Sequence, residues 1–196
     1  MVTRTGWYRL AAGLLATAAS CGAWPQAGAT SQEKRWACCN LRYDKDWISD
    51  RQFTARPFLP VGAPVVITDW GRNRVYADIN GVKMRAGADR EYFKGSREQF
   101  AEVLFLREDP SQRIATFPPA VQAAIRSGRI ALGMTKEQVV MALGPPRFYL
   151  TPVLGAANWV YFAAEDGEFD LDWAADDTLR AIHAPTRIRK LVELPS

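Results

Sequence analysis

The cysteines and the only histidine are the residues of this chain whose types could carry reactive chemistry. Cys38 and Cys39 are adjacent. In an oxidising compartment such a pair could act as a redox switch or form an intermolecular bridge. A disulfide between neighbours closes an awkward ring, so we expect two small, buried and inert side chains instead. His183 has no nucleophile or carboxylate that the sequence assigns to it, and we expect a structural histidine. Neither feature predicts a metal site.

Acidic side chains form a second candidate group. Acidic and apolar residues alternate along Glu168–Trp173, which places the three acids on one face of a strand. The preceding Glu165-Asp166-Gly167 lacks the alternating ligands of a calcium loop. The chain also has no G-x-S-x-G elbow, phosphate-binding loop or H-E-x-x-H helix. We therefore expect a solvated strand face, no catalytic residues and no cofactor.

Several aromatic residues could line a sugar or peptide groove, although packing in a core is the simpler expectation. They are Trp36, Trp47, Trp70, Tyr76 and Tyr92.

Residues 1–29 have the pattern of an export signal. Arg4 and Arg9 precede an apolar run, and small residues around Ala29 suit cleavage. A competing hypothesis is a lipoprotein in which Cys21 carries the lipid, although Ala replaces the usual Leu three residues before it. We expect a bacterial cell-envelope location, in the periplasm or at the periplasmic face of the outer membrane.

Composition is that of an ordinary globular protein. Of the 196 residues, 48% are hydrophobic, and the formal net charge is +4. Loss of Arg4 and Arg9 would lower that charge to +2, so no nucleic-acid partner is predicted. The basic run Arg187–Lys190 could contact anionic phospholipid, although ordinary solubilising charge explains it equally well.

The best-defined predicted element is a helix within Gly133–Pro146. Thr135 suits the N-cap, and Gln138 can complete a capping box. Gly144 suits a left-handed C-terminal residue, and the prolines after it stop the helix. A second helix is expected over Pro118–Gly128. Three short strands should follow, over Trp159–Phe162, Phe169–Trp173 and Leu179–Ile182.

This order, with the segment GMTKEQVVMALGPPR at its centre and NWVYF opening the strands, resembles the SmpA/OmlA (BamE-like) family over residues 114–194. The resemblance implies an α+β fold, with two helices packed on a three-stranded antiparallel sheet. It also implies a non-enzymatic accessory role in building or maintaining the outer membrane through protein contacts, with the outer-membrane assembly machinery among the candidate partners. The matched positions are fold determinants: Gly133, Met134, Thr135, Leu143, Gly144 and Pro145.

The first half, residues 36–110, is predicted to be rich in β-strands. Strands are expected over Val65–Trp70, Val75–Ile79 and Val82–Arg85, with a hairpin turn at Asn80-Gly81. This pattern resembles small SH3-like modules. A helix is expected over Glu98–Leu106, before a linker around residues 108–111.

Two other functions stay open from the sequence. The C-terminal pattern also resembles β-lactamase-inhibitor proteins, which would make the chain an inhibitor or binding module for a secreted hydrolase. A peptidoglycan-directed protein is the other alternative.

Overall fold

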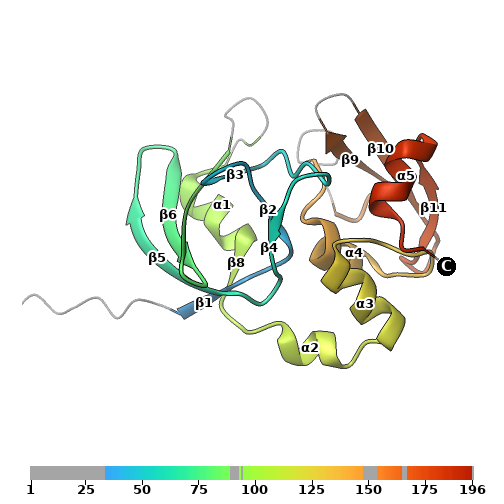
Figure 1. The fold of residues 1–196 in the computed structure, drawn as a ribbon, viewed down its shortest axis with the longest axis horizontal. Helices are drawn as coiled ribbons and strands as arrows, with labels where there is room; N and C mark the ends of the chain where they lie inside the picture. Colours follow the sequence, from blue (N-terminus) through green and yellow to red (C-terminus); the bar gives the residue numbers. More distant parts are fainter. Residues whose placement is uncertain (1–33, 89–92, 94, 148–153, 165–166, 196) are drawn as a thin grey trace, which may run out of the picture. The chain divides into compact units, whose positions relative to one another are not determined.

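A curled six-stranded sheet occupies the first half of the described chain (Figure 1). The computed structural model describes residues 34–88, 93, 95–147, 154–164 and 167–195. The strands lie in the order β3-β7-β6-β5-β1-β8. They are β1 (Lys34–Ala37), β3 (Trp47–Ser49), β5 (Pro64–Trp70), β6 (Arg74–Ile79), β7 (Val82–Gly87) and β8 (Phe105–Leu106). A separate antiparallel pair joins β2 (Leu41–Arg42) to β4 (Phe58–Leu59).

The turn between β6 and β7 confirms the predicted hairpin. Asn80 and Gly81 both have positive φ, 51° and 85°. Two consecutive positive φ values match the twist of a two-residue hairpin, and Asn-Gly tolerates them best. The antiparallel pairing of β6 and β7 begins where Ile79 lies opposite Val82. It ends where Arg74 lies opposite Gly87.

Helix α1 (Arg97–Leu104) packs against β6 and β7. Its capping box joins Ser96 and Gln99, and it buries Phe100 and Leu104. The predicted helix over Glu98–Leu106 was wrong at its end, because Phe105 and Leu106 form β8. Backbone pairing of these two residues with β1 replaces the last helical turn.

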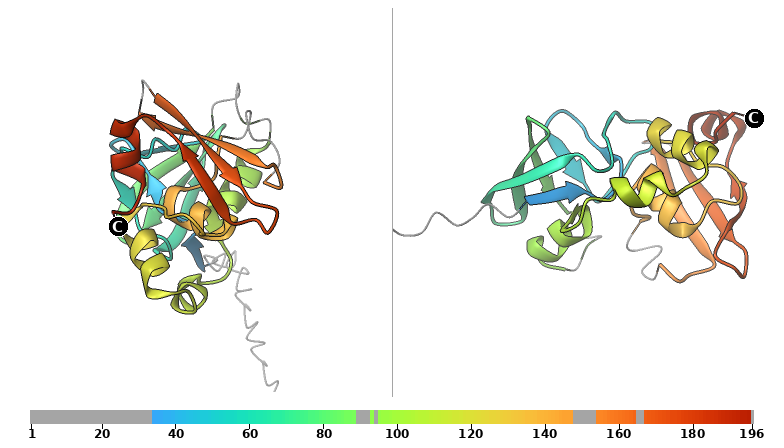
Figure 2. Two further views of the ribbon diagram at one scale, coloured as in Figure 1. Left: turned by 90° about the vertical axis from the view of Figure 1, so that its right-hand side faces the viewer. Right: turned by 90° about the horizontal axis from the view of Figure 1, so that it is seen from below.

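The second half contains a three-stranded antiparallel sheet in the order β11-β10-β9. Its strands are β9 (Asn158–Ala164), β10 (Gly167–Trp173) and β11 (Leu179–His183). Along β10, Phe169, Leu171 and Trp173 are buried, which confirms the predicted alternation. The protein is therefore of mixed α+β class, with helices beside this sheet (Figure 2).

Two helices expected from the sequence are present, α3 (Pro119–Ser127) and α4 (Lys136–Leu143). They pack against each other, and both contribute to a core shared with the three-stranded sheet. The structure adds two short helices that the sequence did not predict, α2 (Ser111–Ala115) and α5 (Thr186–Val192). Helix α5 carries the basic run, and it buries Ile188 and Val192 in the same core.

The start of α4 confirms the predicted capping box, in which Thr135 and Gln138 each accept the other's backbone N–H. The end of α4 corrects one expectation. Gly144 has a positive φ of 88°, but its ψ of 176° is extended rather than left-handed helical. Pro145 explains the difference, because the proline ring disfavours helical ψ in the residue before it. Glycine still suits the position, since side-chain-bearing residues avoid this region.

The two halves belong to one compact unit that spans residues 32–196. The buried side chain of Asn40 links them, since its Nδ2 donates to the carbonyl oxygens of Ile125 (2.7 Å) and Ala142 (3.0 Å). Its Oδ1 accepts the N–H of Val61 at 3.1 Å. Val140 on α4 packs against both hydrophobic cores.

Candidate functional site

A groove of about 530 Å³ opens where α4 and β9 meet the edge of the six-stranded sheet. We call it the apolar groove. Helix α4 supplies one wall, and residues near β1, α1 and β8 supply the other. The lining residues are Cys38, Val103, Leu106, Lys136, Glu137, Val140, Met141, Pro145, Leu154 and Trp159. Most of them are apolar, so the groove offers a hydrophobic surface to a ligand.

Exposure differs along the groove. Met141 and Cys38 are 7% exposed and Trp159 is 1% exposed, so they form its interior. Leu154 is 54% exposed, which is unusual for a large apolar side chain and places it at the mouth.

The first turn of α4 places one charge of each sign on the groove. Lys136 Nζ lies 2.6 Å from Asp177 Oδ1 and within 6 Å of the rings of Trp159 and Trp173. Glu137 pairs with Arg113 at 2.9 Å, and this hydrogen bond raises the pKa of Arg113. An apolar interior with charges of both signs at its border is the usual composition of a protein-binding surface.

One polar atom of a residue that lines the groove lacks a partner. The indole N–H of Trp159 is buried and has no hydrogen-bond acceptor among the described residues. A buried donor without an acceptor costs free energy. A ligand that carries a carbonyl or carboxylate oxygen beside apolar groups could satisfy it.

Cys38 lines the groove, and the expectation that both adjacent cysteines are buried is confirmed. Cys38 and Cys39 are joined by a disulfide, and both are buried. The backbone N–H of Cys38 donates to the carbonyl of Leu104, which ties the segment after β1 to the end of α1. Cys38 therefore reaches the groove as part of a cross-linked turn.

His183 lies on the exposed face of the three-stranded sheet. Its Nε2 is 2.8 Å from Asp172 Oδ2. This hydrogen bond is the main reason that the pKa of Asp172 is lowered. A hydrogen bond that Asn158 Nδ2 donates to Asp172 lowers the pKa further. The acids of β10 are half-buried or exposed, as expected, and Glu168 pairs with Arg147. Within the residues that the structure describes, no group of three potential ligands could hold a metal ion.

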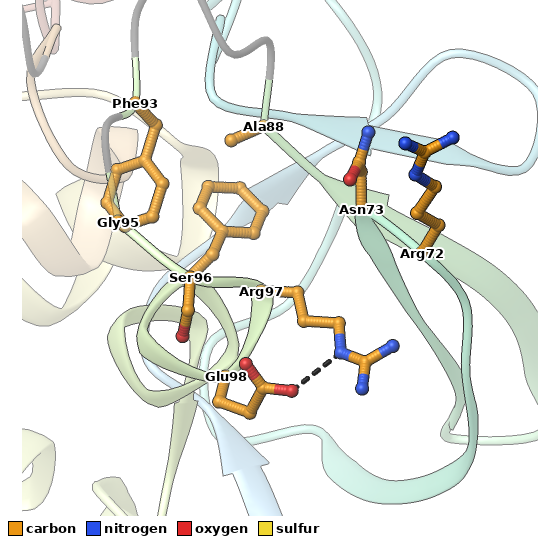
Figure 3. Close-up of a pocket in the computed structure, with 9 residues that line it drawn as sticks. Arg72, Asn73, Ala88, Phe93, Gly95, Ser96, Arg97 and Glu98 are labelled. Carbon is orange, nitrogen blue, oxygen red and sulfur yellow. Dashed lines mark hydrogen bonds and ion pairs between the residues drawn. The ribbon is translucent and has the colours of Figure 1, made fainter.

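A second pocket, of about 290 Å³, lies at the N-terminus of α1 (Figure 3). Arg97 Nε pairs with Glu98 at 2.6 Å, and the rings of Phe93 and Phe100 meet edge to face at 5.3 Å. The pairing of Arg97 and Glu98 and the capping box of α1 use the polar groups at this helix end. We therefore assign no ligand to this pocket.

The basic residues of α5 border a third, open pocket of about 530 Å³. Arg189 pairs with Glu193 at 2.9 Å, and Arg129 donates to the carbonyls of Lys190 and Glu193. These contacts hold the helix end to the rest of the protein. Contact with anionic phospholipid stays a prediction.

The residues predicted as fold determinants occupy structural positions around α4. Met134 is 1% exposed, and Leu143 is fully buried. Gly133 turns with a φ of 82° ahead of the N-cap Thr135, whereas Pro145 lines the apolar groove. Cys21 lies outside the described residues.

The aromatic residues singled out from the sequence do not build the groove. Trp36, Trp47 and Tyr76 are half-buried, Trp70 is 38% exposed, and Tyr92 lies outside the described residues. The groove uses Trp159 instead, which the sequence marked only as the start of a strand. The place of Trp159 in the groove depends on contacts between segments that are distant in the sequence. No local sequence pattern predicts such contacts.

No helix in the described ranges is both long and apolar enough to cross a membrane. Comparisons with protein-family models, curated proteins and solved structures found no match to this chain.

Proposed function

We propose that this chain is a non-enzymatic accessory protein of the bacterial cell envelope, which acts through protein contacts in outer-membrane assembly or maintenance. The apolar groove is the observation that carries the proposal. It takes an apolar segment of a partner protein, whose side chains fill the space between α4 and Leu106. Burial of this surface drives the association.

The chemistry of the groove favours a protein segment as its occupant. A polypeptide brings apolar side chains together with backbone carbonyl groups, and one carbonyl can accept the indole N–H of Trp159. Lys136 and Glu137 can then orient the partner, because charges at the border of an interface act mainly on specificity.

The family resemblance and the expected export signal support the same proposal. The segment that resembles the SmpA/OmlA family supplies α4, which forms one wall of the groove. We propose that residues 114–194 form a BamE-like domain and that residues 36–110 form an SH3-like module. An export signal in residues 1–29 and a disulfide at Cys38 are both in keeping with an oxidising envelope compartment.

A matched pair of leucine variants tests this function. Leu154 lines the groove and is 54% exposed, whereas Leu132 lies before α4 and is 56% exposed. Because both side chains are already open to solvent, a glutamate at either position should leave the fold intact. In cells without the chromosomal gene, Leu154→Glu should fail to restore the outer-membrane barrier. Leu132→Glu should restore it, as measured by sensitivity to detergent and large antibiotics.

Two results would contradict the proposal. One is full restoration by Leu154→Glu. The other is loss of function in a folded His183→Ala variant, since an accessory that acts through a binding surface does not depend on one imidazole.

A further inference from the structure

A small cavity of about 130 Å³ lies beside β2 and β3, apart from the apolar groove. Three arginines line it, Arg42, Arg51 and Arg56, and Asp44 is the one acidic residue in its wall. We call it the arginine pocket. Tyr43, Trp47 and Phe53 supply aromatic surface. Its lining carries more positive than negative charge.

Arg42 is the buried arginine of this pocket. It is 7% exposed, and its guanidinium stacks on Phe58 with 4.5 Å between the guanidinium carbon and the ring centre. Nη1 donates to the carbonyl of Arg56 at 2.8 Å, and Nη2 donates to the carbonyl of Gly128 at 2.9 Å. All of these partners are neutral.

The Nε–H donor of Arg42 is unused. Its Nε–H is buried and has no acceptor in the described part of the chain, and no carboxylate contacts the guanidinium there. Burial lowers the pKa of Arg42 to about 10, so the group is still a cation near neutral pH. Buried charges are normally paired, because removal from water is costly.

The one carboxylate in the wall of the pocket does not contact Arg42. Arg56 Nη1 pairs with Asp44 Oδ2 at 2.5 Å and lies over the ring of Phe53. The single carboxylate is therefore already engaged by Arg56. The positive charge of Arg42 therefore has no opposing charge in the pocket wall. A further negative group would be favourable there.

We propose that the arginine pocket binds a small oxyanion, a phosphate or carboxylate group, with one oxygen accepting the Nε–H of Arg42. Guanidinium groups match the geometry of both anions and bind them through charge-assisted hydrogen bonds. The volume is that of roughly four water molecules, which suits one such group and not a bulky molecule. The site is separate from the apolar groove and does not depend on the function proposed for it.

Anion binding at the site can be followed directly from the chemical shift of the Arg42 Nε–H signal in the ¹H–¹⁵N spectrum of the whole chain. Inorganic phosphate and acetate are titrated separately at constant ionic strength, with chloride as the reference anion. We expect a saturable shift of this signal with phosphate, acetate or both, and the tighter of the two identifies the anion. A shift that grows linearly with either anion, as it does with chloride, would overturn the proposal.

Variants of the pocket wall separate binding from folding, since replacement of Arg42 itself would remove contacts that hold Gly128. Arg56→Gln removes one cation and should weaken binding about tenfold, whereas Asp44→Asn removes the opposing charge and should tighten it several-fold. Arg180→Gln is the matched control. This arginine is exposed and pairs with Asp172, outside the pocket. An equal loss of affinity in Arg180→Gln and Arg56→Gln would show only general charge attraction and would contradict a built site.

Discussion

The hydroxyl group of Tyr161 donates to the carbonyl oxygen of Gly144, 3.0 Å away, in the interior of the protein. This contact joins the middle of strand β9 to Gly144, the residue at which α4 ends. It is one of the interactions that hold α4 against the three-stranded sheet, and α4 in turn forms a wall of the apolar groove. Burial raises the pKa of Tyr161, so the hydroxyl stays a donor throughout the neutral range.

Removal of that donor should destabilise the protein. Tyr161→Phe leaves the Gly144 carbonyl buried without the hydroxyl, which should cost about 1–2 kcal/mol in the free energy of unfolding. Tyr76→Phe is the control, because the Tyr76 hydroxyl makes no hydrogen bond among the described residues. Urea denaturation of both variants gives the comparison. Equal changes for the two would contradict a role for the Tyr161 hydroxyl.

The conformation of Gly144 predicts a second difference. A Cβ there would lie 3.1–3.4 Å from the side chain of Gln52, at a φ of 88°. Gly144→Ala should therefore cost about 2–3 kcal/mol. Gly133 has a similar φ of 82°, but its Cβ would meet no atom within 4 Å, so Gly133→Ala should cost only about 1 kcal/mol. If both variants lost the same stability, contact with Gln52 would not matter.

Asn40 should be essential to the junction of the two halves. Its side chain makes three hydrogen bonds, to Ile125, Ala142 and Val61, and is fully buried. Asn40→Ala should cost about 3 kcal/mol, because it leaves these backbone groups buried without partners. Hydrogen exchange should show faster opening at Val61. Unchanged exchange there would mean that Asn40 does not hold the junction.

The Asp172 carboxylate predicts a modest dependence of stability on pH. His183 holds the pKa of Asp172 below its ordinary value, so the carboxylate stabilises the folded state above the unfolded-state pKa. That contribution is lost as the pH falls through the lower, folded-state pKa. Asp172→Asn should therefore be less stable than the wild type at pH 7, and the difference should shrink as the pH falls below the ordinary pKa of an aspartate. Because the pair is exposed, the effect is small. A difference independent of pH would contradict this account.

Features that depend on a few neighbouring residues were predictable from the sequence. Thr135 and Gln138 specify the start of α4, and Asn80-Gly81 specifies a hairpin turn, because each acts on its own backbone. The alternation along β10 likewise follows from the two-residue period of a strand. Even here Pro145 changed the outcome, since it set the ψ of Gly144.

Features that join distant segments were not predictable. The groove brings Cys38, Leu106 and Trp159 together from three separate strands or their ends. The contact between Arg42 and Gly128 spans 86 residues, and no spacing in the sequence marks it. The helical state of residues 186–192 also depends on tertiary packing, because Ile188 and Val192 are anchored in the core of the other elements.

Photo-crosslinking from the mouth of the apolar groove tests the central proposal most directly. A photoreactive amino acid replaces Leu154 in one protein and Leu132 in the other, and both are irradiated in intact cells. Because only Leu154 lines the groove, we expect one discrete crosslink from position 154, to a protein of the envelope, and none to that protein from position 132. The crosslink should disappear when Leu106→Glu is added. Identical crosslinks from both positions, or none from position 154, would contradict the account.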